Sequence, residues 1–593
     1  MPASHRTPGP PAGPSRRTVL GAGSGLAAGA LTLGLAPSAY AAGRRLPFLL
    51  DMVHANPGEP MTESRYNDPR TLASYDYDGQ VINEFRPPHT AVTFDTVDER
   101  TFPAGSEARA WVEDNARRID DHISRAHAAG IGSYFFTDII VLPKRLIELY
   151  GDELLDSEGR ISLHRPRTLE IHRLMLREVF ARFPGIDGLV IRTGETYLQN
   201  VPFHTGNNPI TEGASSHDLL LRLLRDEVCV RAGKHLFFRT WSTGGDRLRD
   251  DPAYYRAVTD KIEPHDKLLF SIKHTASDFW RTVPFNPTLG IGRHRQIAEV
   301  QCAREYEAKG ACPDYIADGV INGFEEYPTG TGTGPRGLSD LVDNPLFAGV
   351  WTWSRGGGWR GPYISSELWC DLNMWVMARW SRDTALGEQG AFRAYAHRAG
   401  LSGAAVDRFR RLALLSAAGT LRGHYSTLLP VKRLTWTRDQ FLGGSDKDLI
   451  PDYDAIAAAG LVEQALAEKA QAARIWQEVT GLADRIPLRD RADRRHLQVS
   501  ARYGLHLYSA IHHGWQVMLR GYTGERSATM RTHVKAWDTT WTSWQRLADR
   551  HPSCATLYQP LGFGKKDADG VYEADPDHGM GPSVDHYRKE LAA

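Results

Sequence analysis

Between residues 46 and 385, short apolar or β-branched runs alternate with segments that carry apolar residues at three- and four-residue spacing. This alternation predicts repeated βα units and a parallel sheet. The clearest predicted helices are 111–129, 167–182 and 216–232. The predicted strands are 47–53, a poorly defined second strand within 81–94, 132–136, 188–191, 235–239, 268–273, 297–303 and 346–353.

Eight parallel strands would close a (β/α)8 TIM barrel, which is the predicted fold class. A doubly wound open sheet is the alternative, although no Gly-rich phosphate turn follows the first predicted strand. Beyond about residue 390 the strand pattern ends, and segments 391–421, 453–486 and 490–519 predict long helices. We therefore expect a catalytic barrel over 42–388 and a helical C-terminal domain over 389–593, with an irregular tail from 557. The Gly-rich segment 329–337 is a candidate mobile lid.

The N-terminus has the pattern of an export signal. Ser15-Arg16-Arg17-Thr18-Val19-Leu20 precedes a Gly/Ala-rich apolar run and then Ala39-Tyr40-Ala41. A twin-arginine signal followed by an A-x-A cleavage pattern predicts that residues 1–41 form a signal peptide. A retained membrane anchor is the less favoured alternative. We expect secretion to the periplasm or cell exterior, with no membrane span in the mature form, because no later run of about 20 apolar residues occurs.

Composition narrows the partners further. Lys plus Arg and Asp plus Glu each number 71, so the chain has no excess of positive charge that would favour a polyanionic partner. No nucleic-acid partner is therefore expected. The five cysteines are an odd number without metal-ligand spacing. We accordingly expect no structural metal and no cofactor.

Candidate catalytic residues are those just beyond the ends of predicted strands, where barrel enzymes place their active sites. Glu195 follows the fourth strand, Asp278 the sixth and Glu305 the seventh. Each has a structural alternative: a helix cap for Glu195 or Asp278, and an ion pair with Arg304 for Glu305. Glu299 lies lower in the seventh strand, where we expect a polar layer inside the barrel.

Candidate substrate-binding residues gather at the same predicted rim. The cations could hold a substrate carboxylate or could only balance the catalytic acids. Aromatic rings could stack on sugars or pack in the core. The candidates are Arg192, Arg239, Lys273, His274, Trp241, His204, Trp353 and Trp359.

Paired carboxylates in a barrel are typical of glycoside hydrolysis, in which one acid protonates the leaving oxygen and another acts as nucleophile or activates water. A retaining glycosidase on neutral sugars, with Glu195 as acid/base and Glu305 as nucleophile, is one alternative. A non-catalytic sugar-binding barrel and a uronate polysaccharide lyase are two others.

The segment Ser271-Ile-Lys-His-Thr-Ala-Ser-Asp-Phe-Trp280 is followed, 21 residues after Asp278, by Glu299-Val-Gln-Cys-Ala-Arg-Glu-Tyr-Glu307. This ordered pair of motifs resembles glycoside hydrolase family 67, the α-glucuronidases, and Glu195 matches the glutamate that ends their fourth strand. The resemblance covers about 250 residues.

The resemblance implies inverting hydrolysis, with Glu195 as general acid and with Asp278 and Glu305 activating water. It also implies that Arg192, Arg239 and Lys273 contact an acidic sugar, and that the C-terminal helices can support a homodimer. The implied substrate is an oligosaccharide or polysaccharide containing uronic acid. The chain departs from the family at two points: the family's N-terminal β-domain has no room before the first predicted strand, and the sequence after Glu195 differs.

Overall fold

The computed structural model describes residues 43–592, except 56–61, 243–245, 328–333, 357–364, 429–445, 552–561, 567–571 and 576–579. The predicted signal peptide and Trp359 lie outside the described residues, as does much of the Gly-rich segment 329–337.

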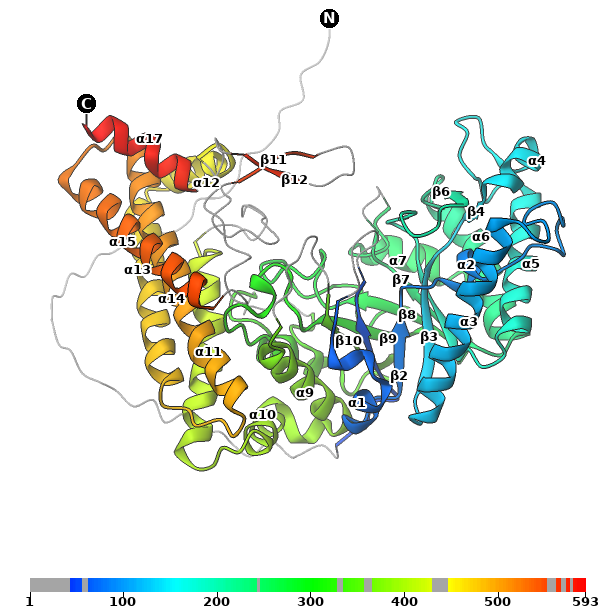
Figure 1. The fold of residues 1–593 in the computed structure, drawn as a ribbon, viewed down its shortest axis with the longest axis horizontal. Coiled ribbons are helices and arrows are strands. Elements are labelled where there is room, and N and C mark those ends of the chain that lie inside the picture. The colour runs from blue at the N-terminus through cyan, green and yellow to red at the C-terminus, as the bar shows by residue number, and fades with distance from the viewer. Residues whose placement is uncertain are drawn as a thin grey trace, which may run out of the picture. The chain divides into compact units, whose positions relative to one another are not determined.

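Eight parallel strands form a closed barrel in the order β1-β10-β9-β8-β7-β5-β3-β2 (Figure 1). The predicted (β/α)8 class is therefore confirmed. The strands are β1 (Phe48–Val53), β2 (Gly79–Ile82), β3 (Gly132–Asp138), β5 (Gly188–Arg192), β7 (His235–Arg239), β8 (Leu268–Lys273), β9 (Arg295–Gln301) and β10 (Phe347–Arg355). A separate antiparallel pair joins β4 (Val141–Pro143) to β6 (His204–Gly206).

The predicted position of the second strand is wrong in its bounds. β2 begins at Gly79 and pairs with β3 from Gly132 onward, so Val81 and Ile82 end this strand rather than begin it. All four residues of β2 are buried, which removes the alternation of apolar and polar residues that marks a half-buried strand. The rest of the predicted stretch instead includes the short helix α2 (Pro87–Thr90).

Apolar side chains from every barrel strand fill the lower interior of the barrel. Alternate residues point inward because successive side chains of a strand lie on opposite faces. The inner cluster includes Leu50, Val81, Phe136, Val190, Phe237, Leu269, Ile297 and Trp351. Polar residues two positions further along several of these strands then form the upper interior.

Helices connect the barrel strands. The predicted helices 111–129 and 167–182 correspond to α3 (Glu107–Ala128) and α5 (Pro166–Arg182). The third corresponds to α6 (Ala214–Leu224), which continues as a π-helical segment, η2 (Arg225–Arg231). The other connecting helices are η1 (Arg65–Asn67), α1 (Pro69–Ser74), α4 (Lys144–Leu154), α7 (Pro252–Thr259), η3 (Ala308–Gly310), α8 (Ala317–Asn322) and η4 (Leu338–Leu341). The last barrel strand is followed by α9 (Leu368–Arg382) and η5 (Thr384–Leu386).

The C-terminal region is helical, as predicted, but two of its predicted helices are each divided. Segment 391–421 contains the end of α10 and most of α11, separated by Gly400 and Gly403, while Gly460 separates α12 from α13. All three glycines have positive φ, a conformation that ends helices and that glycine adopts without steric cost. The helices are α10 (Gly387–Arg398), α11 (Ala404–Gly423), α12 (Asp446–Ala458), α13 (Val462–Ala483), α14 (Arg491–Tyr522), α15 (Ala528–Arg550) and α17 (Met580–Ala592).

The tail is more ordered than its composition predicts. It contains the antiparallel pair β11 (Gly562–Lys566) and β12 (Tyr572–Asp575), followed by α17. α17 packs on α14, where a Cβ added at Gly521 would lie 2.4 Å from the ring of Tyr587. The glycine therefore permits this close helix contact. Among the described helices, none is long and apolar enough to cross a membrane.

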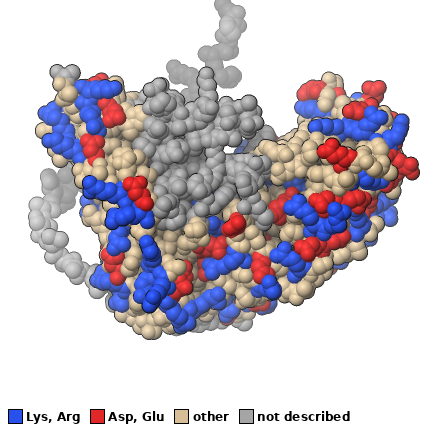
Figure 2. Space-filling model, viewed as in Figure 1, with Lys and Arg blue, Asp and Glu red and all other residues tan. Residues whose placement is uncertain are grey.

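Contacts connect the barrel to the helical region across the predicted boundary at 388/389. The hydroxyl of Tyr425, just beyond α11, donates to Glu307 at 2.7 Å, and Trp369 Nε1 donates to Ser500 Oγ at 3.1 Å. Residues 43–593 form one compact unit, and the predicted boundary stays a prediction. On the face drawn in Figure 2, acidic and basic side chains are interspersed among the described residues.

Candidate functional site

The ends of β3 and β5 carry a buried ion pair. Asp138 and Arg192 are register partners, and Arg192 Nε donates to one carboxylate oxygen of Asp138. The other oxygen accepts from Arg86 at 2.9 Å. Burial would raise the pKa of Asp138, but the two guanidinium groups outweigh it and hold that pKa below its ordinary value. Asp138 is therefore an ionised carboxylate at the floor of the site.

Glu195 lies just above this pair. Its carboxylate is 3.7 Å from Arg192 NH1, and its side chain is 22% exposed. The preceding residue, Gly194, forms a parallel bridge with Ser242 beyond β7. A Cβ at Gly194 would lie 2.2 Å from Ser242 Cα, so the close approach requires glycine and fixes where Glu195 leaves the barrel.

Asp278 is held from two sides. Lys273, the last residue of β8, forms an ion pair with one carboxylate oxygen, and the hydroxyl of Tyr306 donates to the other. The Asp278 backbone has φ +48°, a left-handed conformation that non-glycine residues adopt at a cost. These contacts fix the carboxylate at the carboxyl ends of β8 and β9.

Glu305 follows β9 and is 6% exposed. Its backbone N–H donates to the side-chain oxygen of Gln301 at 2.9 Å. Arg304, with φ +52°, turns away to pair with Glu307 at 2.8 Å and Asp314 at 3.6 Å. Glu307 in turn accepts the hydrogen bond from the helical region, so the helices support the loop that carries Glu305.

Arg239 of β7 and Glu299 of β9 form a second buried pair. Arg239 donates to both carboxylate oxygens of Glu299 at 2.8 and 2.7 Å, and Ser271 Oγ donates to Glu299 at 2.9 Å. The two side chains are 1% and 0% exposed. Glu299 thus lies in a polar layer inside the barrel, and the partner of Arg239 is this carboxylate rather than one of the three predicted catalytic acids.

Aromatic rings surround Lys273 at the upper end of the barrel. Its Nζ lies 3.7 Å from the ring centroid of Trp241 and 5.8 Å from that of Trp353. Trp353 stacks on His54 with centroids 4.9 Å apart and an interplanar angle of 7°. Both tryptophans therefore lie at the site.

The two histidine candidates are structural in their surroundings. His274 contacts the backbone carbonyl of Glu299 at 3.2 Å, and burial lowers its pKa to about 3. His204 lies in β6, against the rings of Phe102 and Trp111, and burial lowers its pKa well below the usual range. Both are neutral near pH 7, and the packing alternative describes His204.

Four consecutive strands of the closed sheet, β5-β7-β8-β9, thus carry the three predicted catalytic carboxylates. Contacts link their ends: Gly194 pairs with Ser242, Trp241 covers Lys273, and Lys273 pairs with Asp278. In the described part of the chain, Arg192 NH2 and Gln301 Nε2 are buried donors without a hydrogen-bond partner. Buried donors are costly to leave unsatisfied, so each of these two groups would be stabilised by an acceptor.

Sequence reasoning missed Asp138, Arg86 and Tyr306. Asp138 continues the inward face of Tyr134 and Phe136 by one more step of two residues, but the predicted strand ended at residue 136. Tyr306 was noted only as part of a motif. No local signal marks Arg86, whose φ of +44° and reach to Asp138 come from the fold.

Comparison with solved structures identifies the fold. A GH138 enzyme described as targeting pectin rhamnogalacturonan II aligns with 93% of this chain and 83% of its own, at a TM-score of 0.59 and 12% identity. The O-GlcNAc hydrolase of Thermobaculum terrenum aligns with 92% of this chain and 94% of its own at 9% identity, but its TM-score of 0.37 is too low to argue from. No protein-family model and no curated protein matches the chain. This chain therefore shares the barrel with a helical C-terminal region found in a glycoside hydrolase.

Proposed function

We propose that this protein is a glycoside hydrolase that uses Glu195, Asp278 and Glu305 for acid/base catalysis. The observation that carries the proposal is the position of these carboxylates beyond the ends of β5, β8 and β9 on one side of the barrel sheet, with Asp278 held by Lys273 and Tyr306. The similarity of the fold to the GH138 enzyme supports the same reaction class.

Each carboxylate has a role suited to its surroundings. Glu195 is the most exposed of the three and is assigned as general acid, placed to protonate a leaving oxygen. Asp278 has a cation and a hydroxyl donor on its carboxylate, and with Glu305 it is assigned to orient and activate water. One acid that protonates the leaving oxygen and separate carboxylates that activate water correspond to inverting hydrolysis.

The proposed substrate is a uronic-acid-containing oligosaccharide met outside the cytoplasm. Lys273 and Arg192 are the cations assigned to its carboxylate, because Arg192 retains a buried unpaired NH2 group among the described residues while Arg239 uses two donors on Glu299. Pectins are rich in uronic acids, and the structurally similar GH138 enzyme targets the pectin rhamnogalacturonan II. Export through the twin-arginine pathway would bring the enzyme to such polymers.

The test is a product screen on uronate-containing fragments of pectin and xylan, beside neutral oligosaccharides. Glu195→Gln should lower turnover about 10²- to 10⁴-fold while ligand binding persists, because the amide keeps the shape but cannot transfer the proton. Glu170→Gln, at an exposed position of α5, is the matched control and should retain full activity.

The products separate the alternatives. Release of a uronic acid in the inverted anomeric form, followed by NMR, supports the full proposal. Retained configuration would reassign Glu305 as nucleophile, and an unsaturated product absorbing in the ultraviolet would indicate a lyase. Wild-type-like turnover of Glu195→Gln would refute the assignment of the general acid.

A further inference from the structure

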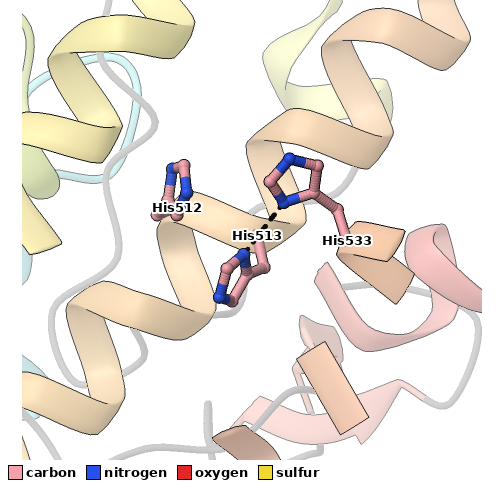
Figure 3. Close-up of side chains that lie close together, drawn as sticks. All are labelled: His512, His513 and His533. Atoms are coloured by element: carbon pink, nitrogen blue, oxygen red, sulfur yellow. Dashed lines mark hydrogen bonds between the residues drawn. The ribbon is translucent and has the colours of Figure 1, made fainter. Parts of the chain in front are cut away.

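Three histidines meet between two helices of the C-terminal region. His512 and His513 lie on α14 and His533 lies on α15. One ligand nitrogen from each can be chosen so that all lie within 4.8 Å of one another. Figure 3 shows the rings of His513 and His533 facing each other, with His512 beside them.

The rings are already close to the spacing that a shared metal ion requires. The Nδ1 atoms of His513 and His533 are 3.0 Å apart. Two imidazole nitrogens on a tetrahedral zinc ion, each at about 2.0–2.1 Å from the metal, lie roughly 3.3 Å from each other. The ring centroid of His512 is 4.7 Å from that of His513 and 5.4 Å from that of His533. A side-chain rotation of the partly buried His512 would therefore complete the set.

Helix packing beside the cluster fixes the distance between α14 and α15. A Cβ at Gly514, which follows His513, would lie 2.3 Å from Met580 Sδ and 3.1 Å from the ring of Trp537. Glycine at this position lets α15 and α17 approach α14 closely. The histidines thus project from a tightly packed helix junction rather than from mobile loops.

His512 also offers a nitrogen to a ligand. Within the described residues, the buried Nδ1 of His512 has no hydrogen-bond partner. Neutral imidazole nitrogens are ligands for zinc, copper and nickel.

We propose that His512, His513 and His533 form a binding site for a first-row divalent transition metal, with Zn²⁺ as the reference ion. Three imidazoles leave a fourth position for water or another ligand. A bound ion would cross-link α14 to α15 and stabilise the helical region. The expectation of no metal rested on cysteine spacing, whereas this site joins residues 20 positions apart in sequence.

The experiment uses the full chain, stripped with a chelator and titrated with ZnCl₂ by calorimetry, with thermal unfolding measured in parallel. We expect one Zn²⁺ per chain and a rise in the unfolding temperature, because an ion that binds only the folded state stabilises it. His513→Ala and His533→Ala should each weaken binding by at least about 10-fold. His506→Ala, two helical turns before His513 on α14, is the matched control and should bind as the wild type does.

The outcomes decide the proposal without reference to catalysis. Unchanged affinity in both cluster variants would place the ion elsewhere and overturn the site, as would a wild type that binds no Zn²⁺ and shows no thermal shift. If an alanine variant fails to fold, Cu²⁺ bound to the wild type provides the test by electron paramagnetic resonance. Coupling to several imidazole nitrogens supports the site, and coupling to none or one refutes it.

Discussion

The Arg239–Glu299 pair offers the sharpest test of how the barrel is built. Both side chains are almost fully buried, and the guanidinium donates two hydrogen bonds to the carboxylate. In Glu299→Gln the amide nitrogen would replace one accepting oxygen and face a guanidinium donor. The variant would leave a buried charge without its partner, for which the cost is about 3–5 kcal/mol of unfolding free energy.

A second substitution separates this cost from any loss of packing. Adding Arg239→Met to Glu299→Gln removes the unpaired charge while retaining an apolar chain beside Trp351, and should recover most of the lost stability. Urea unfolding of the wild type, both single variants and the double variant gives the coupling free energy. Asp114→Asn is the exposed control, because its 2.9 Å pair with Arg117 is more than half exposed and should contribute under about 1 kcal/mol.

The reasoning fails if Glu299→Gln costs less than about 1 kcal/mol, since a buried charge cannot lose its partner so cheaply. The reasoning also fails if the double variant is no more stable than Glu299→Gln alone. Loss of turnover with unchanged stability would have a different meaning: Glu299 would then belong to the catalytic machinery rather than to a structural layer beneath it.

Three further predictions concern single groups. Tyr306→Phe removes a hydrogen bond to the Asp278 carboxylate and should lower kcat/KM about 10- to 100-fold, with a shifted pH profile in steady-state assays. Burial raises the pKa of Asp51 to about 7. The contribution of its neutral carboxyl to stability is full below about pH 4 and is lost as the pH rises to 7. Asp51→Asn should therefore unfold at a higher temperature than the wild type at pH 8, and at a similar temperature near pH 4. Burial lowers the pKa of His89 and His274 to about 3. The stability that depends on their neutral forms is full above about pH 6.5 and is lost as the pH falls toward 3. In His274→Gln the unfolding free energy should therefore fall less steeply with decreasing pH than in the wild type, and an unchanged slope would contradict this.

Much of the barrel was predictable because its signal is local. Strands such as β8 and β7 centre on short apolar runs bounded by loops, and their predicted bounds match the structure. β2 was misplaced because a four-residue strand that is wholly buried has no periodicity of its own. The helix breaks at Gly400 and Gly460 were missed because a glycine inside an apolar helical pattern marks an end only when its φ is positive.

The site was predictable only as far as strand ends reveal it. Glu195, Asp278 and Glu305 follow apolar runs, and that position is enough to propose them. Which charged side chains pair with one another could not be predicted, because it depends on which strands become neighbours in the barrel. Asp138 meets Arg192 only through the β3–β5 register, and the fold alone brings Arg86 to the same carboxylate.

The ion pairs at the site constrain the choice of substrate more than the number of cations does. Among the described residues, four carboxylates, those of Asp138, Glu195, Asp278 and Glu299, lie against the cations Arg86, Arg192, Arg239 and Lys273. Glu305 adds a fifth carboxylate, which is 6% exposed. Hydrolysis requires one of these acids to be protonated, which would leave the site close to neutral.

A uronate substrate adds one negative charge to this balance, so a cation must be shared with it. Arg239 is the poorest source, because its pair with Glu299 is the most buried and uses two hydrogen bonds. Lys273 is the better source, since Asp278 is 14% exposed and retains the hydroxyl of Tyr306 if the ammonium turns toward a ligand. Recognition of an acidic sugar would then also alter the charge beside Asp278, which couples substrate binding to the carboxylate assigned to activate water.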